Sequence, residues 1–455
     1  MKTINNKNKN GLVNVFKEGS LFNRLSFLIM GLGNICYGQI IKGIMFLAVE
    51  VMYILYMIRS GVNNLAGLTT LGTKQQGMVI DETQGIYVME AGDNSMLILL
   101  WGVVTIVVSA VFLLGWYLSV RSGYEAYKTV KSGKKPANFF AEIKSLANQN
   151  IHIAFLTVPL LGILIFTVTP LIYMILMAFT NYDANHQPPG NLFDWVGLAN
   201  FKALASSTGA LAATFWPILA WTLIWGFVAT FSCYFLGIFL AILINSKGIR
   251  FKKFWRTIFV LTMAIPAFIS LLVIRTMVGE NGILNVLLQQ WGFTAQPLPF
   301  LTNGTWAKIS VIVINLWIGI PATMLMTTGI LMNIPAELYE SAQIDGAGKV
   351  KTFIYITFPY MIFVTTPYLI TQLIANFNNF GVIFFLTEGA PLSLNYYKGA
   401  GKTDLLVTWL YKLTTTNKDY NLAATIGIVI FVISAVFSLI SYSRSGAVKN
   451  EEGFS

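Results

Sequence analysis

ESAQIDGAGKVKTFIYITFP, residues 340–359, is a polar stretch between two long apolar runs. Pro335, just before it, can occupy the first turn of a helix, where the missing N–H of proline costs nothing. Gly346 and Gly348 can end that helix, because glycine tolerates left-handed backbone. A second helix then begins near Lys349 and enters the following apolar run. The stretch therefore predicts a short helix, a glycine break and an angled return into apolar surroundings.

The composition predicts an all-α polytopic membrane protein. A soluble protein carries about a quarter charged residues, whereas this chain of 455 residues has 11% and is 55% hydrophobic. Apolar runs of about 20 residues recur, which is the length that crosses a bilayer. The eight predicted spans lie near 40–59, 97–120, 153–178, 217–244, 256–278, 308–332, 358–386 and 422–442. The glycine-interrupted apolar stretch 24–38 is interpreted as interfacial or re-entrant.

The distribution of basic residues predicts the orientation. Lys and Arg collect in 2–24, 121–144, 247–256 and 349–351, which precede the first span or fill every second loop. Because cytoplasmic loops carry the excess of basic residues, we expect both termini and the polar stretch to be cytoplasmic. The net charge of +11 is then a result of topology and does not indicate nucleic-acid binding. No cleaved signal peptide is expected.

The basic segment 121–150 predicts a linker with an amphipathic helix on the membrane surface. It divides the chain into a two-span N-terminal extension, 1–150, and a six-span core, 151–455, which contains the loop 335–359.

The spans carry few groups that could perform chemistry. No hydrolytic, redox, metal-binding or cofactor-binding pattern is present in the sequence, so no metal or cofactor is expected. Cys36 and Cys233 are expected to be buried thiols. Glu50 is expected to pair with Lys42 or to face another helix, and Arg275 to extend to the outer interface.

Four polar residues in the seventh predicted span form a stripe. Tyr368, Gln372, Asn376 and Asn379 fall within about 80° of one helix face. Amides in a span are expected to face a polar cavity or another helix. Amides suit sugar hydroxyls, and Tyr368 can stack on a pyranose ring. Hydrogen bonding between helices is the alternative, and Asn378, on the opposite side, is assigned to it.

The polar stretch closely resembles the EAA loop of bacterial ABC-importer permeases, with the pattern E-A-A, three residues, G, nine residues, I, one residue, L-P. Glu340, Ala342, Gly346, Ile356 and Pro359 are in register. Ser341 and Phe358 depart from the pattern. In that family the loop docks on a cytoplasmic ATPase, whereas the alternative is an ordinary helical turn between spans. The coupling residues that the resemblance implies are Glu340, Ser341, Ala342, Asp345, Gly346 and Pro359.

Further segments resemble the larger, MalF-type subunit of maltose/maltodextrin importers over about 153–445. They are WVGLANF at 195–201, NLWIGIP at 315–321, ANFNNFGVIFFLTEGAP at 375–391 and TDLLV at 403–407. The resemblance implies the type I ABC importer permease fold, with sugar bound between spans six and seven. The positions that it implies, besides Tyr368 from the stripe, are Ile318, Gly319, Ala322, Gln372, Ala375, Asn376 and Asn379.

Two alanines depart from the pattern of that subunit. Ala322 and Ala375 stand where aromatic residues occur in the resembling family, which predicts a wider site for a longer maltodextrin or another oligosaccharide. The large external domain that some members insert between spans three and four is absent, since only about forty residues lie there.

The resemblance implies a permease subunit of an ABC importer for maltodextrin-type oligosaccharides in the bacterial cell membrane. Its implied partners are a second homologous permease, two ATPase subunits and an extracellular sugar-binding protein. Gly399–Thr403 resembles the end of a Walker A loop, but Tyr396 stands where its first glycine is required. We therefore expect no enzyme activity in this chain and ATP hydrolysis in another subunit.

Three alternatives stay open. The first is an ABC permease for a different oligosaccharide. The second is a secondary sugar transporter that works alone, which the shortage of acidic residues in the spans disfavours. The third is a scaffold or receptor, which would not need amides at mid-membrane.

Overall fold

The computed structural model describes residues 12–81, 85–246 and 248–444. It divides into two compact units, residues 1–196 and 197–455, and each has its own buried apolar cluster.

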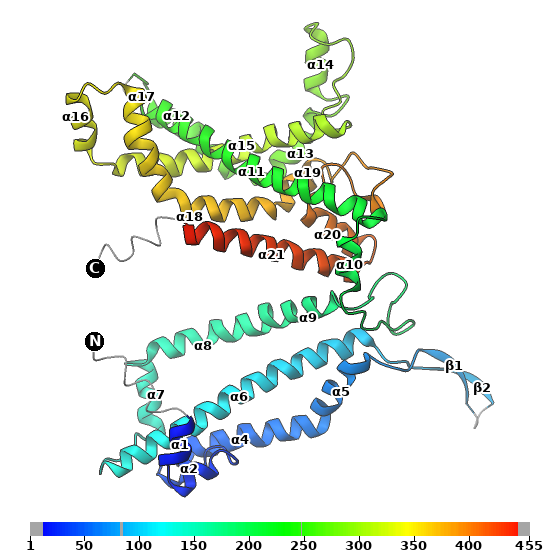
Figure 1. Ribbon diagram of the computed structural model, residues 1–455, viewed down its shortest axis with the longest axis vertical. Coiled ribbons are helices and arrows are strands. Elements are labelled where there is room, and N and C mark those ends of the chain that lie inside the picture. Colours follow the sequence, from blue (N-terminus) through cyan, green and yellow to red (C-terminus); the bar gives the residue numbers. More distant parts are fainter. Residues whose placement is uncertain (1–11, 82–84, 247, 445–455) are drawn as a thin grey trace. The chain divides into compact units, whose positions relative to one another are not determined.

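The first unit is helical apart from one hairpin (Figure 1). Its described elements are α1 Leu12–Glu18, α2 Leu21–Leu25, α3 Leu32–Cys36, α4 Ile40–Tyr56, the π-helical turn η2 Met57–Gly61, α5 Val62–Thr70, β1 Gly77–Asp81, β2 Ile86–Glu90, α6 Ser95–Lys131, α7 Phe139–Ala147, α8 Ile151–Ile163, η3 Leu164–Val168 and α9 Thr169–Met177.

The second unit is helical in its described part. Its elements are α10 Ala199–Ala205, α11 Ala210–Asn245, α12 Lys252–Ala264, α13 Ala267–Met277, α14 Ile283–Gln290, α15 Gly304–Asn333, α16 Ala336–Ile344, α17 Lys349–Thr352, the π-helical turn η4 Phe353–Thr357, α18 Phe358–Phe377, α19 Phe380–Leu386, the 3-10 turn η5 Tyr397–Gly399, α20 Leu406–Thr415 and α21 Tyr420–Arg444.

The prediction of an all-α polytopic membrane protein is confirmed. Seven helices in the described part are long and apolar enough to cross a membrane, and the bent pair α12–α13 makes up to eight. Each of the eight predicted segments overlaps one of these helices or the bent pair.

Two predicted spans are broken rather than continuous. In the fifth, α12 and α13 are bent by 93°. Pro266 lacks the N–H that would continue the helix, and the residue before a proline avoids helical backbone, as the ψ of 126° at Ile265 shows. In the seventh, α18 ends at Phe377 and α19 begins at Phe380.

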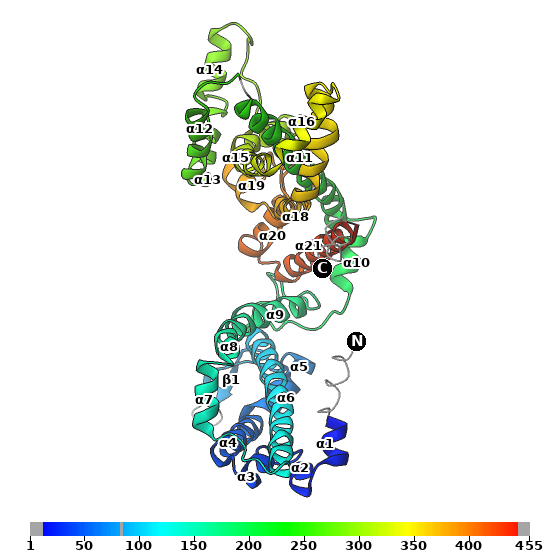
Figure 2. The same cartoon turned by 90° about the vertical axis from the view of Figure 1, so that its left-hand side faces the viewer.

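In the first unit, α4 and α6 lie side by side, with α3 packed against both (Figure 2). The predicted interfacial stretch 24–38 contains the end of α2 and all of α3. A Cβ at Gly31 would overlap the backbone carbonyl of Gly43, so glycine permits this close approach. The predicted surface helix in 121–150 corresponds to α7, while α6 continues to Lys131.

The charges of the first unit differ from expectation. Lys42 pairs with Glu142 at 2.8 Å, so the alternative that Glu50 pairs with Lys42 is wrong. Glu50 Oε2 instead accepts a hydrogen bond of 2.8 Å from the backbone N–H of Met30. The carboxylate therefore satisfies a backbone donor between α2 and α3.

The boundary between the compact units lies after Val196, one span later than the sequence division at residue 150. The reason is that α9 packs against α6, and α8 against α7, within the first unit. Which helices form the functional core stays a prediction.

The second unit is built around α11, which contacts both α15 and α18, while α21 packs against α18 and also contacts α11 (Figure 1). Trp225 of α11 is fully buried among apolar residues of α13, α15 and α19. In Figure 1, α16 lies beside α17 at one end of this unit. Elsewhere in this unit, α11, α13, α15, α18 and α19 surround a cavity.

Candidate functional site

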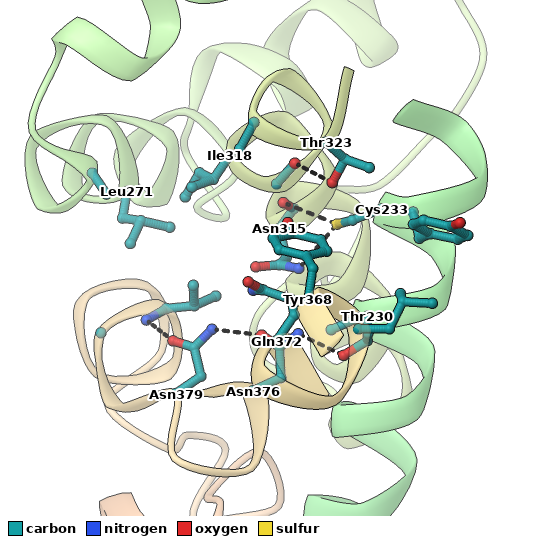
Figure 3. Close-up of a pocket in the computed structure, with 18 of the residues that line it drawn as sticks. Thr230, Cys233, Leu271, Asn315, Ile318, Thr323, Tyr368, Gln372, Asn376 and Asn379 are labelled. Carbon is teal, nitrogen blue, oxygen red and sulfur yellow. Dashed lines mark hydrogen bonds between the residues drawn. The ribbon is translucent and has the colours of Figure 1, made fainter. Parts of the chain in front are cut away.

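The cavity has a volume of about 330 Å³ and lies among α11, α13, α15, α18 and α19 (Figure 3). This volume is at the lower end of the range for small-molecule sites, about 300–1,000 Å³. Most of its lining is apolar, with a few amides, hydroxyls and one thiol. Such a lining, apolar with a few placed polar groups, is typical of sites for small organic ligands.

Seven of the eight sequence-selected residues line this cavity. They are Ile318, Gly319 and Ala322 from α15, Tyr368, Gln372 and Asn376 from α18, and Asn379 from the break after α18. The eighth, Ala375, does not line it and is exposed elsewhere, because neighbouring helical residues point about 100° apart.

Asn379 reaches the cavity in a different way from that predicted. It is the N-cap of α19 rather than part of the α18 face, and its Oδ1 accepts from the backbone N–H of Val382 at 3.2 Å. Its Nδ2 donates to Asn376 Oδ1 at 3.3 Å. Asn378 Nδ2 donates to the carbonyl of Ile374 in its own helix, so the assignment of Asn378 to a contact between helices is wrong.

The other three residues of the stripe, Asn376, Gln372 and Tyr368, differ in whether their side chains form hydrogen bonds within the protein. Asn376 is 4% exposed, and its Nδ2 donates to Thr230 Oγ1 of α11 at 2.8 Å. Gln372 and Tyr368 are half-buried, and among the described residues neither side chain has a hydrogen-bond partner. Figure 3 shows both beside Asn376 at the cavity. Their donors and acceptors are thus available to a ligand.

The polar stretch forms the predicted helix, break and helix. Pro335 is the N-cap of α16, slightly before the predicted position, and Gly348 is the N-cap of α17. Gly346 has a φ of +73°, which only glycine adopts without strain. The space around its missing side chain is open, so the backbone conformation and not a close contact requires glycine.

The sequence-selected coupling residues lie on α16, in the break and at the start of α18. Ala342 is buried, and the exposed ones are Glu340, Ser341, Asp345, Gly346 and Pro359. A short helix at one end of the unit therefore presents polar groups to its surroundings.

Residues 233–445 match the family described as binding-protein-dependent transport system inner membrane component. The chain is 34% identical over 433 residues to the maltodextrin transport system permease protein MdxF of Bacillus subtilis, covering 93% of this chain and 95% of the relative. The chain belongs to this family of ABC-importer permeases. It is MalF-like, and it is a multi-pass protein of the bacterial cell membrane.

Two further similarities cover most of the permease. It is 34% identical over 428 residues to the galactooligosaccharides transport system permease protein GanP of Bacillus subtilis, with 93% and 97% of the two chains covered. A crystal structure of a bacterial ABC transporter involved in the import of the acidic polysaccharide alginate matches with a TM-score of 0.55 and 25% identity, covering 67% of this chain and 98% of that one. The predicted type I importer permease fold is confirmed.

The permease cavity also contains polar residues that the sequence analysis did not select. They are Thr230 and Cys233 of α11 and Asn315 and Thr323 of α15. Asn315 was an available signal, since it is an amide in an apolar span within the quoted segment 315–321. Thr230 gave no signal, because threonine in helices often bonds its own backbone.

The two cysteines of the permease have different environments. Cys233 is buried as predicted, and a Cβ at Gly319 would overlap its sulfur, so that glycine allows α11 and α15 to approach closely. Cys36 is exposed, so the prediction that it is buried is wrong.

Ion pairs join the segments after α19. Asp404, from the quoted TDLLV segment, is fully buried and pairs with Lys412 Nζ at 2.7 Å. Burial raises the pKa of the Asp404 carboxyl, against the opposing effect of Lys412. Arg275, which was expected to extend to the interface, pairs with Glu388 at 2.6 Å. These pairs connect the end of α13 and the last turn of α20 to the loop between α19 and α20.

Proposed function

We propose that this permease carries oligosaccharides of the maltodextrin type through the cavity between α11, α15 and α18. The observation that carries the proposal is the pair Gln372 and Tyr368, whose polar groups face the cavity without protein partners among the described residues. An amide can donate to and accept from sugar hydroxyls, and a tyrosine ring suits the apolar face of a pyranose. The proposed substrate-binding residues are Ile318, Gly319, Ala322, Tyr368, Gln372, Asn376 and Asn379.

The proposed assembly contains three kinds of partner. A second, homologous permease forms a heterodimer with this chain, two ATPase subunits hydrolyse ATP, and an external binding protein delivers sugar. The family description, which names dependence on a binding protein, supports the last of these. Both termini and α16 are cytoplasmic in this proposal, and residues 151–455 form the permease core.

The proposed mechanism is alternating access. The coupling residues Glu340, Ser341, Ala342, Asp345, Gly346 and Pro359 contact an ATPase, and ATP-driven closure of the two ATPases moves α16 and α18. The cavity then opens outward and accepts sugar from the binding protein. ATP hydrolysis stays in the partner subunits.

Galactooligosaccharides are the second candidate substrate class, because the relatives named for the two substrates are equally similar to this chain, at 34% identity. A panel of labelled maltotriose, maltohexaose and galactotriose, offered to the reconstituted complex with its cognate binding protein, separates the two. We expect ATP-dependent uptake of the maltodextrins. Uptake of galactotriose alone would replace the first candidate by the second, and ATP-independent uptake by the purified chain would indicate a secondary transporter.

A further inference from the structure

The hydroxyl groups of Tyr339 and Thr357 are hydrogen-bonded at 3.0 Å. Tyr339 lies on α16, and Thr357 is the last residue of the π-helical turn η4. Among the residues that the structure describes, this is the one side-chain hydrogen bond that joins α16 to another helix. Thr357 is 5% exposed and Tyr339 is half-buried, so this contact is partly sheltered from competing water.

Pro359 accounts for the unusual helix form at this contact. It has no N–H to donate to the carbonyl of Tyr355 four residues earlier, and its ring crowds that carbonyl. The helix is widened into the π form over Phe353–Thr357, which includes Tyr355. Such π turns inside α-helices are frequent at functional positions. The last residue of the EAA-like motif thus shapes the turn that presents Thr357.

One helix leads from this turn to the cavity. α18 begins at Phe358 and runs to Phe377, with Pro367 inside it, and it carries Tyr368, Gln372 and Asn376. Thr357 and Tyr368 are eleven residues apart, or about 17 Å of helix. A displacement of Thr357 is therefore applied to the helix that carries these cavity residues, across Pro367, which lacks the N–H that would bond the carbonyl of Phe363.

Two buried contacts tie the same helix to α11. The hydroxyls of Tyr234 and Thr365 are 2.7 Å apart, and Asn376 Nδ2 donates to Thr230 at 2.8 Å. Tyr234 and Thr230 both line the cavity. Movement of α18 consequently changes the cavity wall on two helices.

We propose that Tyr339 is a positioning residue, which transmits movement of α16 to the cavity through its hydrogen bond to Thr357. The inference rests on the proposed function, in which α16 contacts an ATPase. Tyr339 itself contacts no substrate. Without its hydroxyl, the ATPases still bind and still hydrolyse ATP, but each cycle moves α18 less reliably and imports less sugar.

The test uses the complete complex in proteoliposomes, with labelled maltotriose and labelled galactotriose as alternative probes. Sugar imported per ATP hydrolysed is measured for Tyr339→Phe, Thr357→Val, the double variant and Thr357→Ser. ATPase co-purification and melting temperature are measured alongside. Tyr360→Phe is the matched control. Tyr360 is half-buried in the first turn of α18, close to Thr357, and has no hydrogen bond among the described residues.

We expect Tyr339→Phe and Thr357→Val each to lower the sugar-to-ATP ratio about two- to tenfold, the range for losing one hydrogen bond. Co-purification, ATP hydrolysis and melting temperature stay near those of the wild type. The double variant falls no further than either single one, Thr357→Ser keeps the wild-type ratio because it keeps a hydroxyl, and Tyr360→Phe is unchanged.

Three results would overturn the inference while leaving the proposed function intact. They are an unchanged ratio in Tyr339→Phe, a double variant whose loss is the product of the two single losses, and a parallel fall in ATP hydrolysis and uptake. If the wild-type chain neither retains an ATPase nor imports either sugar, the proposed function fails, and this inference fails with it.

Discussion

Asn376 Nδ2 lies 2.8 Å from Thr230 Oγ1 and joins α18 to α11 at the wall of the cavity. The amide that sequence reasoning assigned to substrate is therefore also a structural contact between helices. Gln372, one turn away on the same helix, lines the same cavity without such a partner among the described residues. Both interpretations of the polar stripe thus apply to Asn376, which lines the cavity and contacts α11, whereas only cavity lining applies to Gln372.

The first prediction concerns Gln372. Gln372→Leu removes an amide that no described residue uses, so we expect transport to fall about two- to tenfold, as for one hydrogen bond of 0.5–1.5 kcal/mol. The melting temperature should stay the same. The control is Asn378→Leu, which removes an exposed amide bonded within its own helix. Equal effects of the two variants on uptake by proteoliposomes would contradict a role of Gln372 in binding.

The second prediction concerns the Asn376–Thr230 contact. Thr230→Val keeps the shape of the side chain and leaves the buried Asn376 amide without this acceptor. We expect a loss of about 1–3 kcal/mol in the free energy of unfolding, the cost of an unsatisfied buried polar group. Denaturant titration in detergent measures it. Adding Asn376→Leu to Thr230→Val should recover part of the loss, and additive losses would show that the two side chains act independently.

The third prediction concerns the two glycines of the coupling segment. Gly346→Ala places a Cβ at a φ of +73° and should weaken ATPase binding about five- to thirtyfold, equivalent to about 1–2 kcal/mol of strain. Gly348→Ala should be close to neutral, because Gly348 has a φ of −71° and open space around it. The affinity of the purified chain for its ATPase distinguishes them. Similar affinities in both variants would contradict the role of the left-handed backbone.

The fourth prediction contrasts two ion pairs. Lys412→Met leaves the fully buried Asp404 carboxylate without its cation, which should cost about 3–5 kcal/mol of stability. Arg275→Met breaks an exposed pair with Glu388 and should cost no more than about 1 kcal/mol. Thermal unfolding of the two variants gives the comparison. If the order is reversed, burial does not decide the importance of these pairs.

The fifth prediction concerns orientation. In a chain whose two native cysteines are replaced, a cysteine at the exposed position Asn185 should react with an impermeant thiol reagent added to whole cells. A cysteine at the exposed position Lys134 should react only after the cells are opened. The reverse pattern would place α16 outside, where no ATPase is present.

Much of the fold could be predicted from the sequence, because the length of an apolar run is set by the thickness of the bilayer. The segment 335–359 was equally predictable, since glycine and proline constrain the backbone locally. The bend at Pro266 was not, because proline is tolerated inside spans wherever neighbouring groups satisfy the freed carbonyls. Whether a proline kinks a helix or divides it depends on packing that the sequence does not display.

The cavity was predictable in part for a similar reason. A helical projection assumes a continuous helix. It therefore predicted correctly that Asn379 faces the cavity, but it assigned Asn379 to the same helix as Asn376, whereas Asn379 is the N-cap of α19. The projection could not reveal that Asn376 uses its amide on Thr230, because that partner lies 146 positions earlier in the chain. Ala375 was selected by resemblance alone, and the structure directs it away from the cavity.

The bend between α12 and α13 has a consequence for the lipid around the protein. The 11 residues of α13 give about 16 Å of helix, roughly half the 30 Å of a hydrocarbon core. The 36 residues of α11 give about 54 Å, more than enough to cross it. Lipid beside α13 therefore contacts a shorter apolar surface than lipid beside α11. The packing of lipid against the α13 side of this unit is then expected to depend more strongly on acyl chain length than the packing against the α11 side.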